Sequence, residues 1–136
     1  MKQIHYRKGY KYQLACDYID NIQIFPGKSI ATDWISLGKT GRLVILKGYA
    51  WDGPSGPTID TASFMRGSLV HDALYALMRM GLLSGGHRQA VDRQLKADCT
   101  EDGMWGLRVK WVYRGVRVGA ASAALPCNVK KVLVAP

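Results

Sequence analysis

A histidine and an aspartate, His71 and Asp72, lie side by side in an otherwise apolar stretch of the chain, and both residue types can do chemistry. Tyr75 follows one helical turn later, and Asp92 lies about as far after Gly81, where the glycine-rich stretch 81–86 begins, as His71 lies before it. If the segments on either side of that stretch form an antiparallel helix pair, positions equally far from the turn come level with each other. We therefore expect Asp92 to contact His71, and we expect the Tyr75 hydroxyl to bond a carboxylate of the same site.

These residues suggest a site that activates water. A carboxylate bound to one imidazole nitrogen fixes the tautomer and leaves the other nitrogen free as a general base. Asp72 is rotated by about 100° from His71 on a helix, so it can face the preceding glycine- and proline-rich loop, which carries Asp52. Two carboxylates and loop carbonyls form a hard-oxygen site suited to Ca²⁺, whereas zinc would need more nitrogen or sulfur ligands. We expect metal-assisted ester hydrolysis without a covalent intermediate: His71 deprotonates water, Asp92 orients His71, and the cation polarises the ester carbonyl.

Other interpretations of the same residues stay open. A buried histidine held between two helices by a carboxylate can serve structure alone, and Asp52 fits an ordinary turn aspartate at least as well as a ligand. Histidine-aspartate phosphohydrolases need further histidines on both sides of the pair, and His5 and His87 are poorly placed for that role. The sequence has no GxSxG or GxxxxGK[ST] pattern, which argues against a serine-nucleophile elbow and against a phosphate-binding P-loop.

The elements that must position this site divide the sequence into a β half and an α half. Short runs of β-branched and aromatic residues separated by turn signals predict a small antiparallel sheet or meander, and apolar residues at helical spacing predict helices after it. The predicted strands cover 12–15, 22–25, 29–37 and 43–46, the predicted helices cover 61–82, 87–100 and 105–120, and 128–135 is a candidate edge strand. The predicted fold is α+β, with the sheet packed against an antiparallel helix hairpin and a third helix. We expect a single domain made of a β-rich region 1–50, a glycine- and proline-rich loop 51–60, a three-helix region 61–120 and a tail 121–136.

The third predicted helix has an apolar side and a basic side. We expect Trp105, Val109, Val112 and Val116 on one face, and Lys110, Arg114 and Arg117 on another. Tryptophans pack in cores more often than they form ligand platforms, so we expect core positions for Trp34, Trp51, Trp105 and Trp111. The adjacency of aromatic and basic residues on this helix is also compatible with an anionic membrane surface or with a protein partner.

Composition limits the classes of protein. With 48% hydrophobic residues the chain is globular, and no apolar run is long enough to span a bilayer. The basic N-terminus lacks the apolar segment of a Sec signal, so we expect a protein that is cytoplasmic as synthesised, and later virion-associated or released at lysis.

The three widely spaced cysteines predict free thiols rather than a disulfide framework. The net charge is +9 and no acidic residue follows Asp102, which fits an anionic partner and fits solubility alone equally well. Among anionic partners, nucleic acid is the weaker option because no nucleic-acid motif is present.

The segment 43–92 resembles the DUF1353 family of phage and prophage proteins. The residues that carry it are Gly48, Asp52, Ser55, Pro57, the run HDALY at 71–75, and Arg88 with Asp92. This family name implies no activity.

The same segment is similar to the core of phospholipase A2, which combines a glycine-rich calcium loop, an HDxxY helix and a later aspartate on an antiparallel helix. That resemblance implies that His71 is the base, that Asp92 orients it, and that Asp72, Asp52 and the carbonyl of Gly53 bind Ca²⁺. The expected function is therefore calcium-assisted hydrolysis of a lipid ester by a phage or prophage protein. The alternative is a non-enzymatic phage accessory or structural protein that binds a phage or host protein and keeps the His-Asp network as scaffold.

Overall fold

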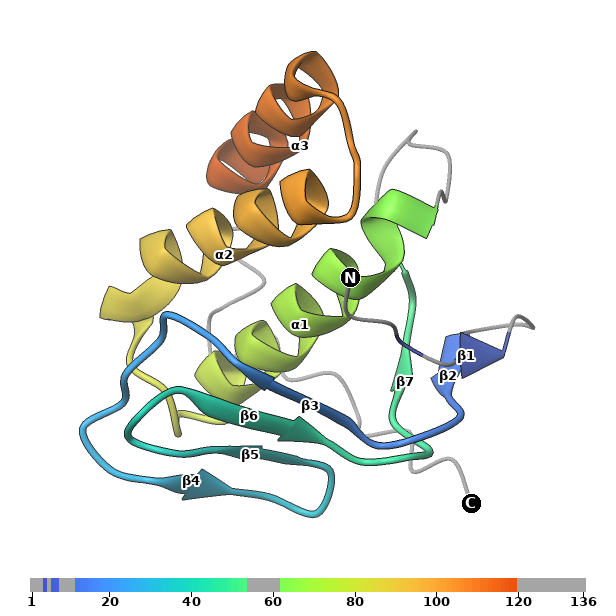
Figure 1. Cartoon of the computed structure of the whole chain (residues 1–136). Helices are drawn as coiled ribbons and strands as arrows, with labels where there is room; N and C mark the ends of the chain where they lie inside the picture. The colour runs from blue at the N-terminus through green and yellow to red at the C-terminus, as the bar shows by residue number, and fades with distance from the viewer. Residues whose placement is uncertain (1–3, 5, 8–11, 54–61, 120–136) are drawn as a thin grey trace.

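The computed structural model describes residues 4, 6–7, 12–53 and 62–119, and within them strands come first and helices follow (Figure 1). The predicted α+β class is confirmed. The strands are β1 (Tyr6–Arg7), β2 (Tyr12–Leu14), β3 (Tyr18–Asn21), β4 (Ile30–Ala31), β5 (Ile35–Leu37), β6 (Arg42–Ile45) and β7 (Ala50–Trp51). The helices are α1 (Ala62–Arg79), the short 3₁₀ turn η1 (Gly85–His87), α2 (Arg88–Glu101) and α3 (Gly106–Gly119). Of the predicted loop 51–60, Trp51 belongs to β7 and residues 54–60 lie outside the described residues. The predicted edge strand 128–135 and the tail 121–136 also lie outside them.

The described strands form two antiparallel sheets, whereas the sequence predicted one. The orders are β1-β2-β7 and β3-β6-β5-β4. The change of sheet occurs at Gly48, whose φ of 99° lets the chain leave β6 and turn into β7. The ring of Trp34 occupies the place where a Cβ would lie at this position, so only glycine fits. Because Gly48 N–H donates to the carbonyl of Leu14 at 2.8 Å, the turn also holds the two sheets together.

Two of the predicted strands differ from the structure. The segment 22–25 has alternating burial but forms no strand, because its neighbour β6 begins only at Arg42 and the chain turns at Gly41. Among the described residues its backbone pairing is limited to one bond, from Ile22 N–H to the Gly41 carbonyl at 2.8 Å. The predicted strand 29–37 is divided into β4 and β5 by a turn in which the Thr32 hydroxyl accepts from the backbone N–H of Ile35 at 2.9 Å. The sequence did not predict β1, β3 or β7.

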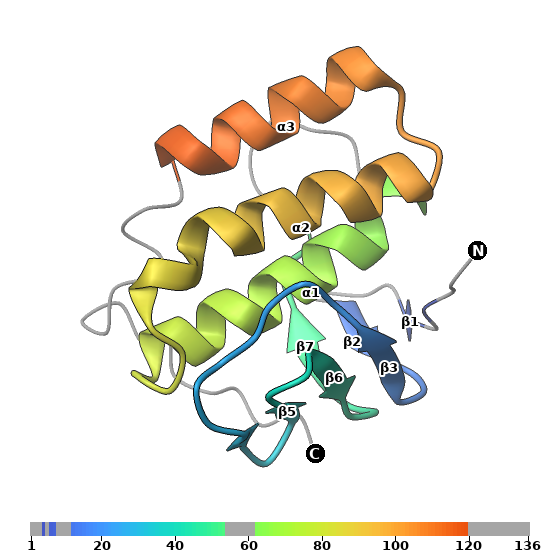
Figure 2. The same cartoon turned by 60° about the vertical axis from the view of Figure 1, so that its left-hand side comes forward.

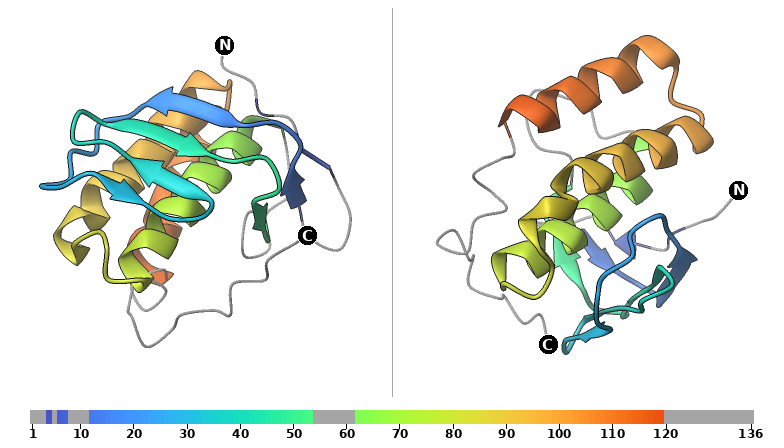
Figure 3. Two further views of the ribbon diagram at one scale, coloured as in Figure 1. Left: turned by 90° about the horizontal axis from the view of Figure 1, so that it is seen from below. Right: turned by 90° about the vertical axis from the view of Figure 1, so that its left-hand side faces the viewer.

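The helices stack in layers on one side of the sheets (Figures 1 and 2). Helix α1 lies against the sheets, α2 lies antiparallel on α1, and α3 lies on α2 as the outermost layer, as the side view in Figure 3 also shows. Since α1 is covered on both sides, most of its residues are buried. None of the described helices is long and apolar enough to cross a bilayer.

The helix boundaries are close to those predicted, but the third helix differs in its faces. Val109 and Val112 are buried as expected. Trp105 is 71% exposed because it precedes the first residue of α3 and therefore does not follow the helical periodicity. The core prediction is also wrong for Trp111, which is 76% exposed, and right for Trp51, which is 2% exposed.

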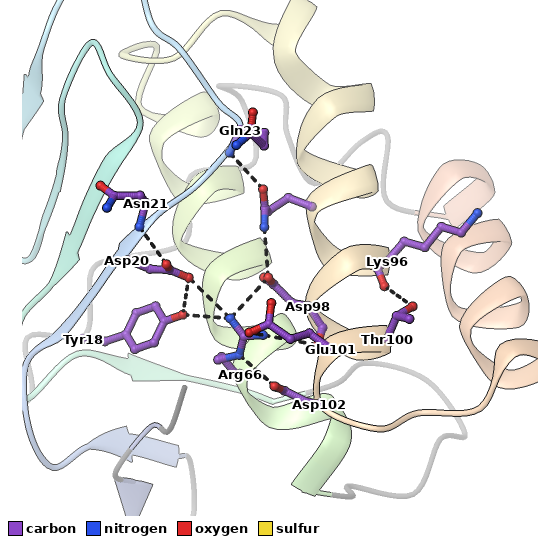
Figure 4. Close-up of polar contacts among 11 residues, drawn as sticks. Tyr18, Asp20, Asn21, Gln23, Arg66, Lys96, Asp98, Thr100, Glu101 and Asp102 are labelled. Atoms are coloured by element: carbon purple, nitrogen blue, oxygen red, sulfur yellow. Dashed lines mark hydrogen bonds and ion pairs between the residues drawn. The ribbon is translucent and has the colours of Figure 1, made fainter. Parts of the chain in front are cut away.

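A buried arginine, Arg66 on α1, ties β3, α1 and α2 together (Figure 4). Its Nε atom donates to both oxygens of Asp102, at 3.1 and 2.9 Å, and its Nη1 atom donates to the Tyr18 hydroxyl at 3.2 Å. Further ion pairs of 3.4 to 3.6 Å reach Asp20, Asp98 and Glu101. A buried cation with several carboxylates fixes which residues face each other across the helix pair.

Close packing at Gly67 sets the distance between the two helices. A Cβ built on Gly67 would lie 2.9 Å from Cδ1 of Leu95 and 3.1 Å from Sγ of Cys99, so α1 and α2 approach each other where α1 has no side chain. Arg66 is level with Asp98, and Gly67 packs between Leu95 and Cys99. Because the helices are antiparallel, going further along α1 means going back along α2, and His71 comes to lie opposite Asp92.

Candidate active site

The contact between His71 and Asp92 across the helix pair is confirmed. His71 Nε2 lies 2.8 Å from Asp92 Oδ1. The Asp92 side chain is fully buried, whereas 13% of the His71 side chain is exposed. The imidazole therefore has one edge fixed against a buried carboxylate and a fraction of its surface open to water.

The Asp92 carboxylate accepts hydrogen bonds on both of its oxygens. Oδ1 accepts from His71 and from the Tyr75 hydroxyl at 2.7 Å, and Oδ2 accepts from Arg117 Nη1 at 2.8 Å. Burial by itself would raise the pKa of Asp92, but the hydrogen bonds from His71, Tyr75 and Arg117 outweigh it, and the pKa lies below its usual value. Asp92 is therefore ionised at neutral pH.

The charge of Asp92 determines the tautomer of His71. An ionised carboxylate can only accept hydrogen bonds, so Nε2 of the neutral imidazole carries the proton and Nδ1 has the free lone pair. Among the described residues, Nδ1 has no hydrogen-bond partner. The arrangement can accept a proton from a water molecule at Nδ1.

Tyr75 supports the same carboxylate, as the sequence predicted for its hydroxyl. Its ring packs on the imidazole of His71, with the centroids 4.2 Å apart and the planes inclined by 31°. Burial and the negative charge of Asp92 raise the pKa of Tyr75, so the phenol keeps its proton and donates to Asp92. Tyr75 thus restricts the orientation of the His71 ring.

Two arginines complete the network. Arg88 Nε donates to the Tyr75 hydroxyl at 3.1 Å, and its Nη2 donates to the carbonyls of Val116 and Arg117 at 3.0 and 2.8 Å. These carbonyls belong to the last turn of α3, where helix carbonyls lack intrahelical partners. Arg88 thereby holds the end of α3 where Arg117 reaches Asp92.

Arg117 was not predicted as a member of the site; it was expected with the basic residues of the third helix. In the structure it turns toward α2, and only 32% of its side chain is exposed. No local pattern distinguishes it from Lys110 and Arg114. Arg88 had a signal, because it belongs to the RxxxD pattern that ends at Asp92.

Asp72 points to a second region of the site, next to the first. Its Oδ2 accepts from the hydroxyl of Tyr49, a buried residue between β6 and β7, at 2.5 Å. Burial and then the charge of Asp72 raise the pKa of Tyr49, with a smaller contribution from Asp52. Asp72 thus faces Tyr49, which directly precedes β7. The prediction that Asp72 faces the loop 51–60 is not tested, because residues 54–60 of that loop lie outside the described residues. Tyr49 was not predicted.

The residues expected to bind calcium offer hard-oxygen donors. Gly53, half-exposed, has a φ of 74°, and the ring of Tyr12 fills the place of its missing Cβ, so the backbone conformation there requires glycine. Asp52 is exposed and Asp72 is half-buried. In the described ranges no three His, Cys, Asp or Glu side chains come together as a metal site. The expected ligand set has two carboxylates and one backbone carbonyl, so it would need water or substrate oxygens to complete a calcium shell.

Comparisons with protein-family models, with curated proteins and with solved structures find no match to this chain.

Proposed function

We propose that this protein hydrolyses a lipid ester with water activated by His71, in the manner of a phospholipase A2. The observation that carries the proposal is the position of His71: Nε2 is held by the buried, ionised Asp92, and Nδ1 lacks a protein partner among the described residues. A structural histidine between two helices would not need an open edge. This geometry suits a general base better than a nucleophile.

The proton transfer follows from the network. A water molecule at Nδ1 gives its proton to His71 and attacks the ester carbonyl, and the imidazolium is stabilised by Asp92. Tyr75 and Arg117 hold the carboxylate in place, so Asp92 keeps its charge and His71 keeps its orientation. The protonated imidazole then returns its proton to the leaving alcohol.

Asp72, Asp52 and the Gly53 carbonyl would hold Ca²⁺ on the adjacent side of α1. A bound calcium ion would supply polarisation of the ester carbonyl and would stabilise the oxyanion. Tyr49 donates to Asp72 and so orients its carboxylate. This tyrosine would act as a positioning residue.

The test measures release of fatty acid from phospholipid vesicles by the purified protein. One series contains calcium at about 1–5 mM, a saturating range, and a parallel series contains chelator instead. We expect calcium-dependent release that His71→Ala reduces by a factor of about 10² to 10⁴. His87→Ala is the matched control, since His87 lies in η1 and takes no part in the network. Absence of release on zwitterionic and anionic lipids alike, or equal rates for wild type and His71→Ala, would refute hydrolysis.

The alternative is a non-enzymatic phage accessory protein that binds a protein partner and keeps the network as scaffold. One observation favours it: both oxygens of Asp92 are satisfied by protein groups, as in a structural ion network. Thermal unfolding with added calcium discriminates between the two functions, because a ligand that binds only the folded state raises the melting temperature. A calcium-dependent rise that Asp72→Asn abolishes supports the hydrolase, whereas insensitivity to calcium together with absent lipid hydrolysis supports the scaffold.

A further inference from the structure

Helix α3 has apolar residues on two opposite faces. Val109, Val112 and Val116 pack against α2 and belong to the smaller of the two hydrophobic clusters. Leu107, Trp111 and Val118 are 61%, 76% and 81% exposed. These last three lie within about 40° of one another around the helix, since positions 4 and 11 residues apart nearly coincide in direction. We call them the outer stripe of α3.

The outer stripe lies on the outermost layer of the molecule. Figures 1 and 2 show that α3 contacts α2 on one side and that the sheets and α1 lie on the far side of α2. A helix with only one packed side normally carries polar residues on the other. Exposed large apolar side chains in a row, one of them a tryptophan, indicate a surface that another body covers.

The charges beside the stripe identify what covers it. Lys110 and Arg114 are exposed and lie along one side of the outer stripe. Residues 103–119 contain four basic and no acidic residues, and no acidic residue follows in 120–136. A surface that is both apolar and purely basic is complementary to one that is both apolar and anionic.

From these features we infer that the outer stripe of α3, with Lys110 and Arg114, binds the surface of an anionic lipid membrane. Apolar and tryptophan side chains enter the boundary between headgroups and acyl chains, while lysine and arginine beside them bind anionic headgroups. A second copy of this chain is a poorer occupant, because a twofold contact through α3 would bring basic residues of both copies together. Nucleic acid would use the basic residues but leave Leu107 and Val118 without a role.

This inference goes beyond hydrolysis, because binding to a membrane requires neither His71 nor calcium. It deepens the proposed function in one respect: α3 carries both the outer stripe and Arg117, which donates to Asp92. A membrane bound along α3 would therefore lie against the helix that completes the network of the candidate active site.

The experiment is sedimentation of the full chain with sucrose-loaded vesicles of phosphatidylcholine alone or with about one third phosphatidylglycerol, in chelator. We expect binding to the anionic vesicles only, weakening with salt. The double variant Leu107→Ser/Trp111→Ser should bind at least tenfold more weakly. Ile19→Ser is its control, since Ile19 is 53% exposed on β3, away from α3. Circular dichroism should show that the variants stay folded, because the side chains changed are exposed.

Two double charge-reversal variants test whether the basic residues beside the outer stripe contribute to binding. Lys110→Glu/Arg114→Glu should abolish binding, whereas Lys28→Glu/Lys39→Glu, which changes net charge equally at exposed positions of the β half, should reduce it only slightly. His71→Ala should bind vesicles as the wild type does, so that loss of hydrolysis and loss of binding are separate results. The inference is overturned if anionic vesicles are not bound, if the α3 variants and their controls bind alike, or if the stripe variants instead abolish a dimer or binding to nucleic acid.

Discussion

Arg117 of α3 donates from Nη1 to Oδ2 of Asp92 on α2, at 2.8 Å, and so reaches the carboxylate that holds His71 of α1. Three helices thus meet at one buried carboxylate. The arrangement makes Asp92 both the orienting group of the candidate active site and a junction of the α layer. Its removal should affect stability and chemistry together.

Asp92→Asn tests this double role. An amide has one acceptor oxygen, whereas His71, Tyr75 and Arg117 all present donors across two oxygens of Asp92, so at least one donor must face the N–H₂ group. We expect the free energy of unfolding to fall by about 2–4 kcal/mol, measured by urea denaturation. Asp33→Asn at an exposed position is the control and should change it by less than about 0.5 kcal/mol. An unchanged stability in Asp92→Asn would show that the network is not a structural junction.

The pKa of Asp92 also predicts a pH dependence at the acid end. Because the folded protein holds this pKa below its usual value, Asp92 contributes stability that is present above about pH 4 and is lost as the pH falls through the folded pKa. Urea denaturation at a series of pH values from about 5 down to about 2.5 should show this loss in the wild type. The loss should be smaller in Asp92→Asn, which has no such carboxylate to protonate.

Much of this site follows from local sequence, and the rest depends on tertiary contacts. The contact of His71 with Asp92 could be predicted because equal distances from a glycine-rich turn determine which residues of a helix hairpin come level. Arg117 could not be predicted, since periodicity indicates the valine face of α3 but not which of the basic residues beside that face reaches a carboxylate on α2. Tyr49 reaches Asp72 only because the chain turns at Gly48 between two sheets, and no short-range pattern encodes that path.

Asp98 predicts a pH dependence of opposite sign. Its Oδ2 atom is buried and has no hydrogen-bond partner in the part of the chain that the structure describes. Burial and, to a smaller extent, the charges of Asp20 and Asp102 raise the pKa of Asp98 to about 6 in spite of Arg66. The folded state therefore favours the neutral form of Asp98 more strongly than the unfolded state does. The stability from Asp98 is fully present below about pH 4, declines as the pH rises, and is lost once the pH passes about 6.

Asp98→Asn isolates this contribution, because asparagine resembles the neutral acid and its oxygen can still accept from Gln94, which now donates to Asp98 Oδ1 at 2.9 Å. We expect the variant to be as stable as the wild type near pH 4 and more stable near pH 7, by up to about 3 kcal/mol. Urea denaturation at both pH values measures the difference. Equal loss of stability at both values would mean that the Asp98 charge stabilises the cluster around Arg66.

Gly67 in the interior of α1 and Gly115 in the interior of α3 should respond oppositely to alanine. Gly115 on α3 has no atom within 4 Å of an added Cβ, so Gly115→Ala should raise the free energy of unfolding by about 0.5–1 kcal/mol through helix propensity. At Gly67 the added methyl would meet Leu95 and Cys99 at 2.9 and 3.1 Å, and overpacking of about 1–3 kcal/mol should exceed that gain. Gly67→Ala should also force α1 and α2 apart and so weaken the contact between His71 and Asp92. Lipid hydrolysis should then fall in Gly67→Ala and stay unchanged in Gly115→Ala. Equal effects of the two substitutions on the free energy of unfolding would show that α1 and α2 are not tightly packed at Gly67.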